Sequence, residues 1–94
     1  MIKVIIERFI ADTLEANYEQ TAKETLQKAI LSAGFISGES LKDIINPRHR
    51  FIICNWRSVI DWQQWELSLE RKEMMGKMNL MLEKEEKVTV LEIP

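Results

Sequence analysis

A β-strand pattern occurs four times in this chain and a helical pattern twice, in the order β-α-β-β-α-β. The first strand, 2–10, carries apolar side chains at both alternating sets of positions, which predicts a central strand covered on both faces. Further strands are expected at 35–43, 51–56 and 87–93. The 94 residues suffice for one domain, 1–94. This order predicts a ferredoxin-like α+β sandwich, in which helices cover one face of a four-stranded antiparallel sheet.

Two amphipathic segments supply the helices. The first has apolar side chains at spacings of three and four over about twenty residues. Asp12 or Thr13 is its expected N-cap, and Gly34 suits the left-handed turn that ends a helix. The second helix should begin at Ser58, which precedes an aspartate at capping-box spacing. Gly76 predicts a break or kink that divides this segment into two short helices.

A sheet with helices on one side leaves its other face bare. We expect Ile2, Val4 and Ile6 on that bare face, where they would form an exposed apolar patch. A second copy packed sheet to sheet would cover the patch. The sequence therefore predicts a homodimer through the open sheet face.

Composition excludes several classes of protein and of site. Thirteen Lys and Arg against fifteen Asp and Glu give a net charge of −2, which argues against nucleic-acid or membrane-surface binding. No apolar stretch approaches the roughly twenty residues of a membrane span, and no secretory signal pattern is seen. One cysteine and one histidine cannot form a Cys/His zinc site. The lone cysteine, Cys54, also fits a reducing cytoplasmic location, and we expect it in the core.

Several segments together are typical of one family. They are GFISGESL at 34–41, Asn46-Pro47, NWRS at 55–58, Trp62, Trp65, Arg71-Lys72 and a closing strand at 88–93. Through them nearly the whole chain resembles the antibiotic biosynthesis monooxygenase family of dimeric α+β barrels. The resemblance implies a homodimer and a monooxygenase that acts on a small molecule.

One branch of that family degrades haem with an asparagine, a tryptophan and a histidine. By resemblance these positions fall on Glu7, Trp65 and Met75, so only the tryptophan is present. A buried carboxylate beside a haem also differs in charge from a neutral amide. Haem binding is therefore the weakest of the functional hypotheses.

The other branch oxidises polyphenols or anthrones with O₂ and without metal or flavin, so the resemblance predicts no cofactor. Such a site needs an aromatic wall and a few polar groups around a small aromatic or quinone-like substrate. The predicted wall is Trp62, Trp65, Phe9 and Tyr18, and the predicted catalytic polar groups are Glu7, Asn55 and Arg57.

Four of these residues also have a structural interpretation. The two tryptophans could fill the core between helix and sheet. Glu7 could form an ion pair with Arg71 or Lys72, and Asn55 could be satisfied by backbone groups. If the face carrying Glu7 met the helices, burial would raise its pKa and suit it to act as a general base. A dimeric domain that binds a small ligand, or merely associates, without catalysis is the alternative function.

Overall fold

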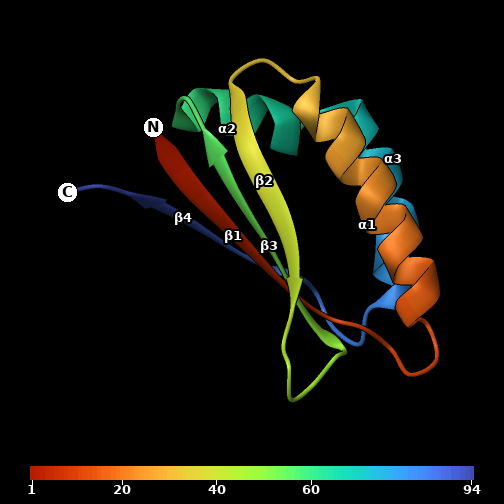
Figure 1. Cartoon of the computed structure of the whole chain (residues 1–94). Coiled ribbons are helices and arrows are strands. Elements are labelled where there is room, and N and C mark those ends of the chain that lie inside the picture. Colours follow the sequence, from red (N-terminus) through yellow and green to blue (C-terminus); the bar gives the residue numbers. More distant parts are fainter.

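The computed structural model, which describes residues 1–94, confirms the strand and helix order, with the second helix in two pieces (Figure 1). The elements are β1 (Ile2–Phe9), α1 (Glu15–Ile30), β2 (Phe35–Lys42), β3 (His49–Trp56), α2 (Val59–Glu66), α3 (Leu69–Met78), the 3₁₀ helix η1 (Asn79–Met81) and β4 (Lys87–Glu92). None of the helices has the length and apolar character that a membrane span requires.

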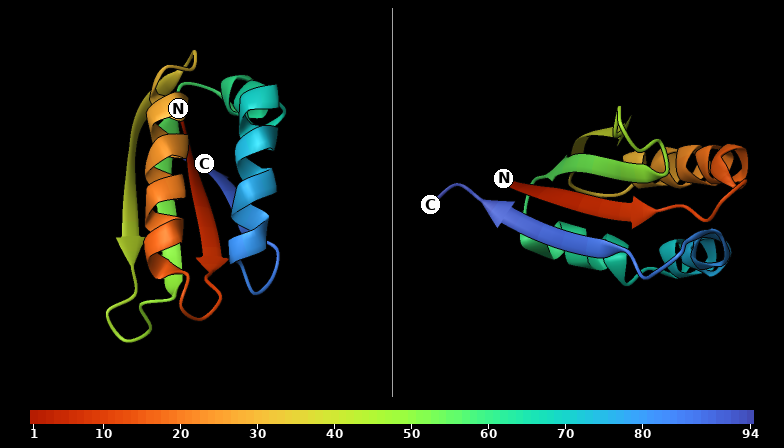
Figure 2. Two further views of the ribbon diagram at one scale, coloured as in Figure 1. Left: turned by 90° about the vertical axis from the view of Figure 1, so that its right-hand side faces the viewer. Right: turned by 90° about the horizontal axis from the view of Figure 1, so that it is seen from below.

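The four strands form one antiparallel sheet in the order β2-β3-β1-β4. β1 is a central strand, as predicted, and Ile5 at its middle lies opposite Ile53 of β3 and Thr89 of β4. All the helices lie on one side of the sheet, and α1 and α3 run along the strands (Figure 2). The molecule therefore has two layers, and the space between them is the place for a core.

The helix-covered face is formed by the even-numbered residues of β1 and β3. Ile2, Val4 and Ile6 are 7%, 0% and 5% exposed and pack under the helices. The prediction that these three side chains lie on the bare face is therefore wrong. Both alternating sets of β1 are partly apolar, so alternation alone separates the two faces without showing which one the helices cover.

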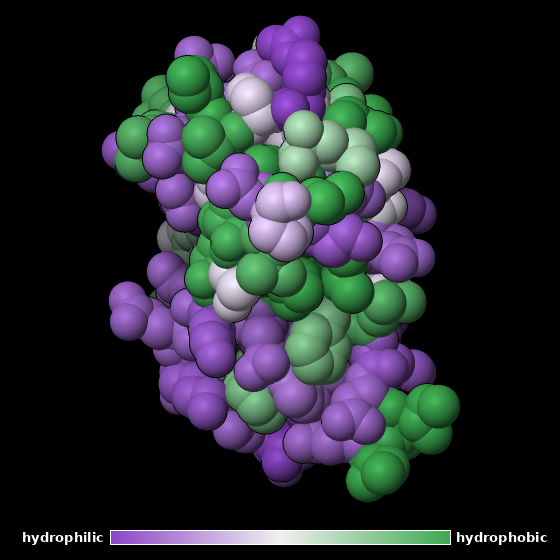
Figure 3. Space-filling view, turned by 90° about the vertical axis from the view of Figure 1, so that its left-hand side faces the viewer, coloured by the Kyte–Doolittle hydropathy of each residue, from purple (hydrophilic) through white to green (hydrophobic).

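The open face carries the odd-numbered side chains. Ile5 and Phe9 of β1 and Phe51 and Ile53 of β3 are half-buried there, although no helix covers them. Hydrophobic side chains gather across the middle and upper part of this face, and hydrophilic ones are concentrated below them (Figure 3). The apolar character expected of the bare face is thus present, but on the other set of residues.

The start of α1 differs from the prediction. Leu14 occupies the N-cap position without a side-chain hydrogen bond, and Thr13 has a left-handed φ of 70°. Neither Asp12 nor Thr13 caps the helix, because the chain uses these residues to turn from β1 toward α1. The helix has 16 residues, shorter than its apolar periodicity suggested.

The second helical segment begins as predicted but breaks elsewhere. The Ser58 hydroxyl accepts a hydrogen bond from the Asp61 backbone N–H at 3.2 Å, which starts α2. The break falls at Ser68, not at Gly76, which lies within α3. Ser68 Oγ donates to the Trp65 carbonyl at 2.7 Å and accepts from the Arg71 backbone N–H at 3.2 Å. These two bonds end one helix and cap the next.

Candidate substrate cavity

A narrow cavity lies between the helix layer and the sheet. Its volume is about 30 Å³, room for about two water molecules, so a ligand ring would have to push its walls apart. Ten of its thirteen lining residues are hydrophobic, so the walls suit an apolar ring. The lining residues are Ile6, Arg8, Ala22, Thr25, Leu26, Ala29, Phe35, Ile52, Cys54, Trp56, Trp62, Trp65 and Arg71.

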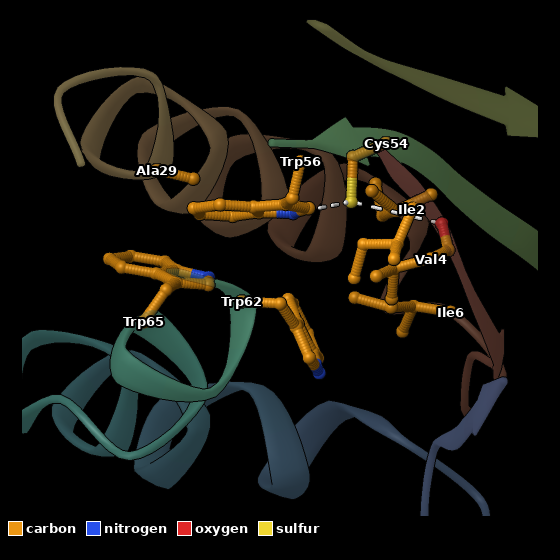
Figure 4. Close-up of a cluster of buried hydrophobic side chains, with 9 residues drawn as sticks. Ile2, Val4, Ile6, Ala29, Cys54, Trp56, Trp62 and Trp65 are labelled. Atoms are coloured by element: carbon orange, nitrogen blue, oxygen red, sulfur yellow. Dashed lines mark hydrogen bonds between the residues drawn. The ribbon is translucent and has the colours of Figure 1, made fainter. Parts of the chain in front are cut away.

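All three tryptophans of the chain line this cavity. Trp62 and Trp65 project from α2 toward Trp56 of β3 (Figure 4). Trp56 and Trp62 meet edge to face, with ring centroids 5.9 Å apart, and the Trp56 indole N–H donates to Cys54 Sγ at 3.3 Å. The predicted pair therefore contributes both to the core and to the cavity wall.

The cavity ends in a charged cluster formed by Arg8, Arg71 and Glu86. Arg8 Nε donates to Glu86 Oε2 at 2.9 Å, and Arg71 donates to the other carboxylate oxygen. Burial acts to raise the pKa of Glu86, but the two arginine charges and their hydrogen bonds outweigh it and lower that pKa. Two guanidinium groups against one carboxylate leave one positive charge in excess beside the apolar walls.

The other two predicted wall residues lie outside the cavity. Tyr18 is fully buried in a neighbouring cluster, where its hydroxyl accepts a hydrogen bond from Arg8 at 3.4 Å. It touches the charged cluster but does not line the cavity. Phe9 lies on the open face, stacked on His49 with ring centroids 4.1 Å apart. Its odd position on β1 places it on the side of the sheet away from the helices.

The three predicted polar groups are also not brought to the cavity. Glu7 lies on the open face, with Oε2 3.5 Å from Nε2 of His49 and not paired with Arg71 or Lys72. Asn55 lies on the same face and donates to the Ser37 hydroxyl at 2.9 Å.

Arg57 is the third predicted polar group, and its side chain is exposed. It donates to both Asp61 oxygens, at 3.0 and 3.1 Å. The hydrogen bonds from Arg57 and Ser58 lower the pKa of Asp61. Arg57 therefore holds the start of α2 in place and does not line the cavity.

The positions that resemble a haem-degrading site do not surround one cavity. Trp65 lines the cavity, whereas Glu7 lies on the opposite face of the sheet. Met75 is buried with Tyr18, and its sulfur lies 3.9 Å from an Arg8 nitrogen. No group of three His, Cys, Asp or Glu side chains is arranged to hold a metal ion.

The structure adds site residues that the sequence analysis did not select. Arg8 shares the buried face of β1 with Ile6, and strict alternation along the strand places them together. Trp56 follows the same rule on β3. A charged residue at an inward position was the available signal for Arg8. By contrast, nothing local in the sequence pairs Arg8 with Glu86, which lies 78 positions later.

No protein-family model and no curated protein sequence matches this chain. Solved structures match its fold along nearly the whole length. An antibiotic biosynthesis monooxygenase superposes with a TM-score of 0.91 at 16% identity, covering 100% of this chain and 99% of that one. A conserved protein from Methanosarcina mazei Go1 gives 0.93 at 16% identity, with coverages of 99% and 92%.

A cofactor-independent oxygenase from Streptomyces nogalater also matches, with a TM-score of 0.86 at 11% identity and coverages of 98% and 92%. At identities this low, the likeness shows the fold alone. The chain therefore has the ferredoxin-like fold of antibiotic biosynthesis monooxygenases, as its sequence pattern suggested.

Proposed function

We propose that this protein is a monooxygenase of the antibiotic biosynthesis monooxygenase type that oxidises a small aromatic or quinone-like molecule with O₂. The observation that carries the proposal is the cavity walled by Trp56, Trp62 and Trp65. Flat aromatic walls suit a planar ring and keep bulk water away from it. The fold, shared with a cofactor-independent oxygenase, supports the same reaction class.

The reaction needs no external reductant when the substrate itself is electron-rich. An anthrone CH₂ group and one O₂ give a C=O group and one water, so one oxygen atom enters the product and the other leaves as water. The two electrons that reduce the second oxygen atom come from the substrate, together with its two hydrogens. The role of the protein is to bind the ring, orient it and stabilise its deprotonated form.

Oxygen uptake tests this proposal. The purified protein is mixed with a panel of hydroquinones and anthrones, and O₂ consumption is compared between the wild type and Trp65→Phe. The wild type should consume O₂ with at least one panel member. Trp65→Phe should lower the rate about tenfold or more, since small displacements of a bound ring are costly to catalysis.

Ile60→Ala is the matched control, because this exposed residue lies on the same helix and outside the cavity. The control should retain the wild-type rate. A wild type that consumes no O₂ with any substrate, or a Trp65→Phe variant as active as the control, would contradict the proposal.

Ligand binding without turnover is the second candidate function. One observation favours it: the cavity lining contains no carboxylate and no histidine that could accept a proton from a phenol. In that case an aromatic ligand would quench the tryptophan fluorescence, while no O₂ would be consumed with any member of the panel.

We also propose that two copies associate through the open sheet face. The support is the apolar band formed by Ile5, Phe9, Phe51 and Ile53, which no helix covers. In the centre of the band Ile5 and Ile53 are directly opposite each other. Packing this face against a second copy would remove the band from water and complete a dimeric α+β barrel.

A further inference from the structure

Three arginines are buried on the helix-covered side of a protein whose net charge is −2. Arg8, Arg50 and Arg71 are 3%, 5% and 8% exposed. Arg8 and Arg50 are direct partners across β1 and β3, and both guanidinium groups lie about 6 Å from the centre of the Tyr18 ring, at 5.9 and 5.7 Å. Like charges opposite each other destabilise a sheet. Their burial together therefore calls for a negative partner.

The carboxylates of the chain neutralise these arginines only in part. Glu86 is shared between Arg8 and Arg71. Arg50 pairs with Glu19 at 3.0 Å, but the Glu19 side chain is 59% exposed and largely solvated. Three buried cations thus face two carboxylates, neither of which is fully buried.

A basic groove leads from the surface to this cluster. It lies between α1 and β2, which run side by side (Figure 2). Its charged residues are Glu19, Lys23, Lys42 and Arg50, three positive and one negative. The groove is wider than the cavity and open to solvent.

The groove and the cavity share two lining residues, Ala22 and Leu26. Leu26 therefore stands between the surface and the three tryptophans. A Cβ at residue 38 would lie 3.1 Å from Leu26 Cδ1, so Gly38 leaves the room that the leucine occupies. Leu26 is only half-buried, so it is the side chain that must move for a ligand to pass from the groove into the cavity.

We propose that the cavity takes an anionic aromatic molecule, which enters through the α1–β2 groove past Leu26 and places its negative oxygen against Arg8 and Arg71. This inference rests on the cavity of the proposed function and names its substrate class. Arg8 and Arg71 would act as positioning and specificity residues. The planar fork of a guanidinium group matches the two oxygens of a carboxylate, and nearby positive charge favours the ionised form of a phenol.

Binding of two matched probes tests the inference. Anthraquinone-2-carboxylate and anthraquinone-2-carboxamide share a ring system and differ in one charge. Because all three tryptophans line the cavity, quenching of the intrinsic fluorescence reports on this site. The carboxylate should bind about tenfold more tightly or better, since hydrogen bonds to a charged group are about twice as strong as neutral ones.

Arg71→Met should abolish this preference while leaving the carboxamide affinity nearly unchanged. Arg48→Met is the matched control, because Arg48 forms a surface pair with Glu83 away from the cavity. Arg71→Lys keeps the charge but loses the fork, and should bind the carboxylate with an affinity between those of the wild type and Arg71→Met. Circular dichroism of each variant establishes that it is folded before its affinity is compared.

The entry route has its own variant. Replacing Lys23 and Lys42 together with alanine should slow association of the carboxylate several-fold at low salt and leave the carboxamide unaffected. An unchanged association rate would overturn the route.

Other results would overturn the proposal as a whole. They are equal affinities of the two probes for the wild type, a carboxylate preference that survives Arg71→Met, and no quenching by either probe. Fluorescence quenching measures binding of the probes and does not depend on O₂ consumption. A carboxylate preference without O₂ uptake would support the anionic ligand and contradict the proposed reaction. O₂ uptake without a carboxylate preference would support the proposed reaction and contradict the anionic ligand.

Discussion

Replacing glycine by alanine at residues 34 and 76 applies one chemical change in two opposite environments. Gly34 has a φ of +83°, and an added Cβ would fall well within 3.0 Å of the Asp61 side chain. That carboxylate cannot move away easily, because Arg57 and Ser58 both hydrogen-bond to it. Gly76 lies inside α3, and a Cβ there would meet no atom within 4 Å.

The two expected effects have opposite signs. A left-handed backbone costs an alanine about 1–2 kcal/mol. Forcing an extra carbon into a filled space costs about 1–3 kcal/mol more, so Gly34→Ala should lower the free energy of unfolding by about 2–5 kcal/mol. Gly76→Ala should raise it by about 0.5–1 kcal/mol, because alanine is the better helix former. The two variants should therefore differ by about 2.5–6 kcal/mol.

Urea unfolding followed by tryptophan fluorescence measures this difference. All variants must be compared at one protein concentration, since self-association would add to apparent stability. Gly38→Ala provides an intermediate case, because its Cβ would lie 3.0–3.3 Å from three neighbours, one of which is the flexible end of Leu26.

Gly34→Ala and Gly76→Ala variants of equal stability would refute the reasoning. So would a stabilising effect of alanine at residue 34. Either result would mean that the turn before β2 does not press against the first turn of α2. The placement of Trp62 and Trp65, which follow that turn, would then be in doubt.

Two further predictions concern the charged cluster and the open face. Glu86→Gln should lower the free energy of unfolding at pH 7 by about 3–5 kcal/mol, because it leaves Arg8 and Arg71 buried without their counter-charge. The pKa of Glu86 is lower in the folded state than in the unfolded state. The ionised carboxylate therefore adds to the free energy of unfolding above the unfolded-state pKa, and this stabilisation is lost as pH falls through the folded-state pKa. Unfolding measured from pH 7 to pH 3 should show a steeper loss for the wild type than for the variant, and equal slopes would refute this. Ile53→Lys should convert the dimer to a monomer, as measured by sedimentation velocity. Ile44→Lys, at a loop residue that is 97% exposed, should leave the dimer intact. A wild type that is monomeric at all concentrations would contradict the proposed dimer.

Much of the fold was predictable because the signals are local. Periods of about two and 3.6 residues separate strands from helices within single segments. The hydroxyl of Ser58 caps α2 through a backbone group three residues away, so its role could be read from the spacing. The break at Ser68 was missed because Gly76 looked like the stronger interruption. In α3 the glycine simply continues the helix, while Ser68 offers its hydroxyl to two backbone groups.

The candidate site was only partly predictable. Trp62 and Trp65 share one face of a helix that had to pack on the sheet, and both reached the cavity. Glu7 and Phe9 did not, because both faces of β1 carry apolar side chains and the helices cover the even-numbered one. Glu7 and Arg8 are neighbours in β1 and lie on opposite faces of the sheet. Because the helices cover the even-numbered face, the site contains a positive arginine where a negative glutamate was predicted.

By itself the sequence determined the order of the elements, the central place of β1 and the aromatic character of α2, since each follows from residues close together in the chain. Only the tertiary structure decided which face of the sheet is covered. That choice buries Arg8, brings Glu86 to it across 78 positions and leaves the cluster one positive charge in excess. The physical reason is that charge balance inside a core depends on contacts between distant segments. The repeating pattern of side chains within one segment does not indicate those contacts.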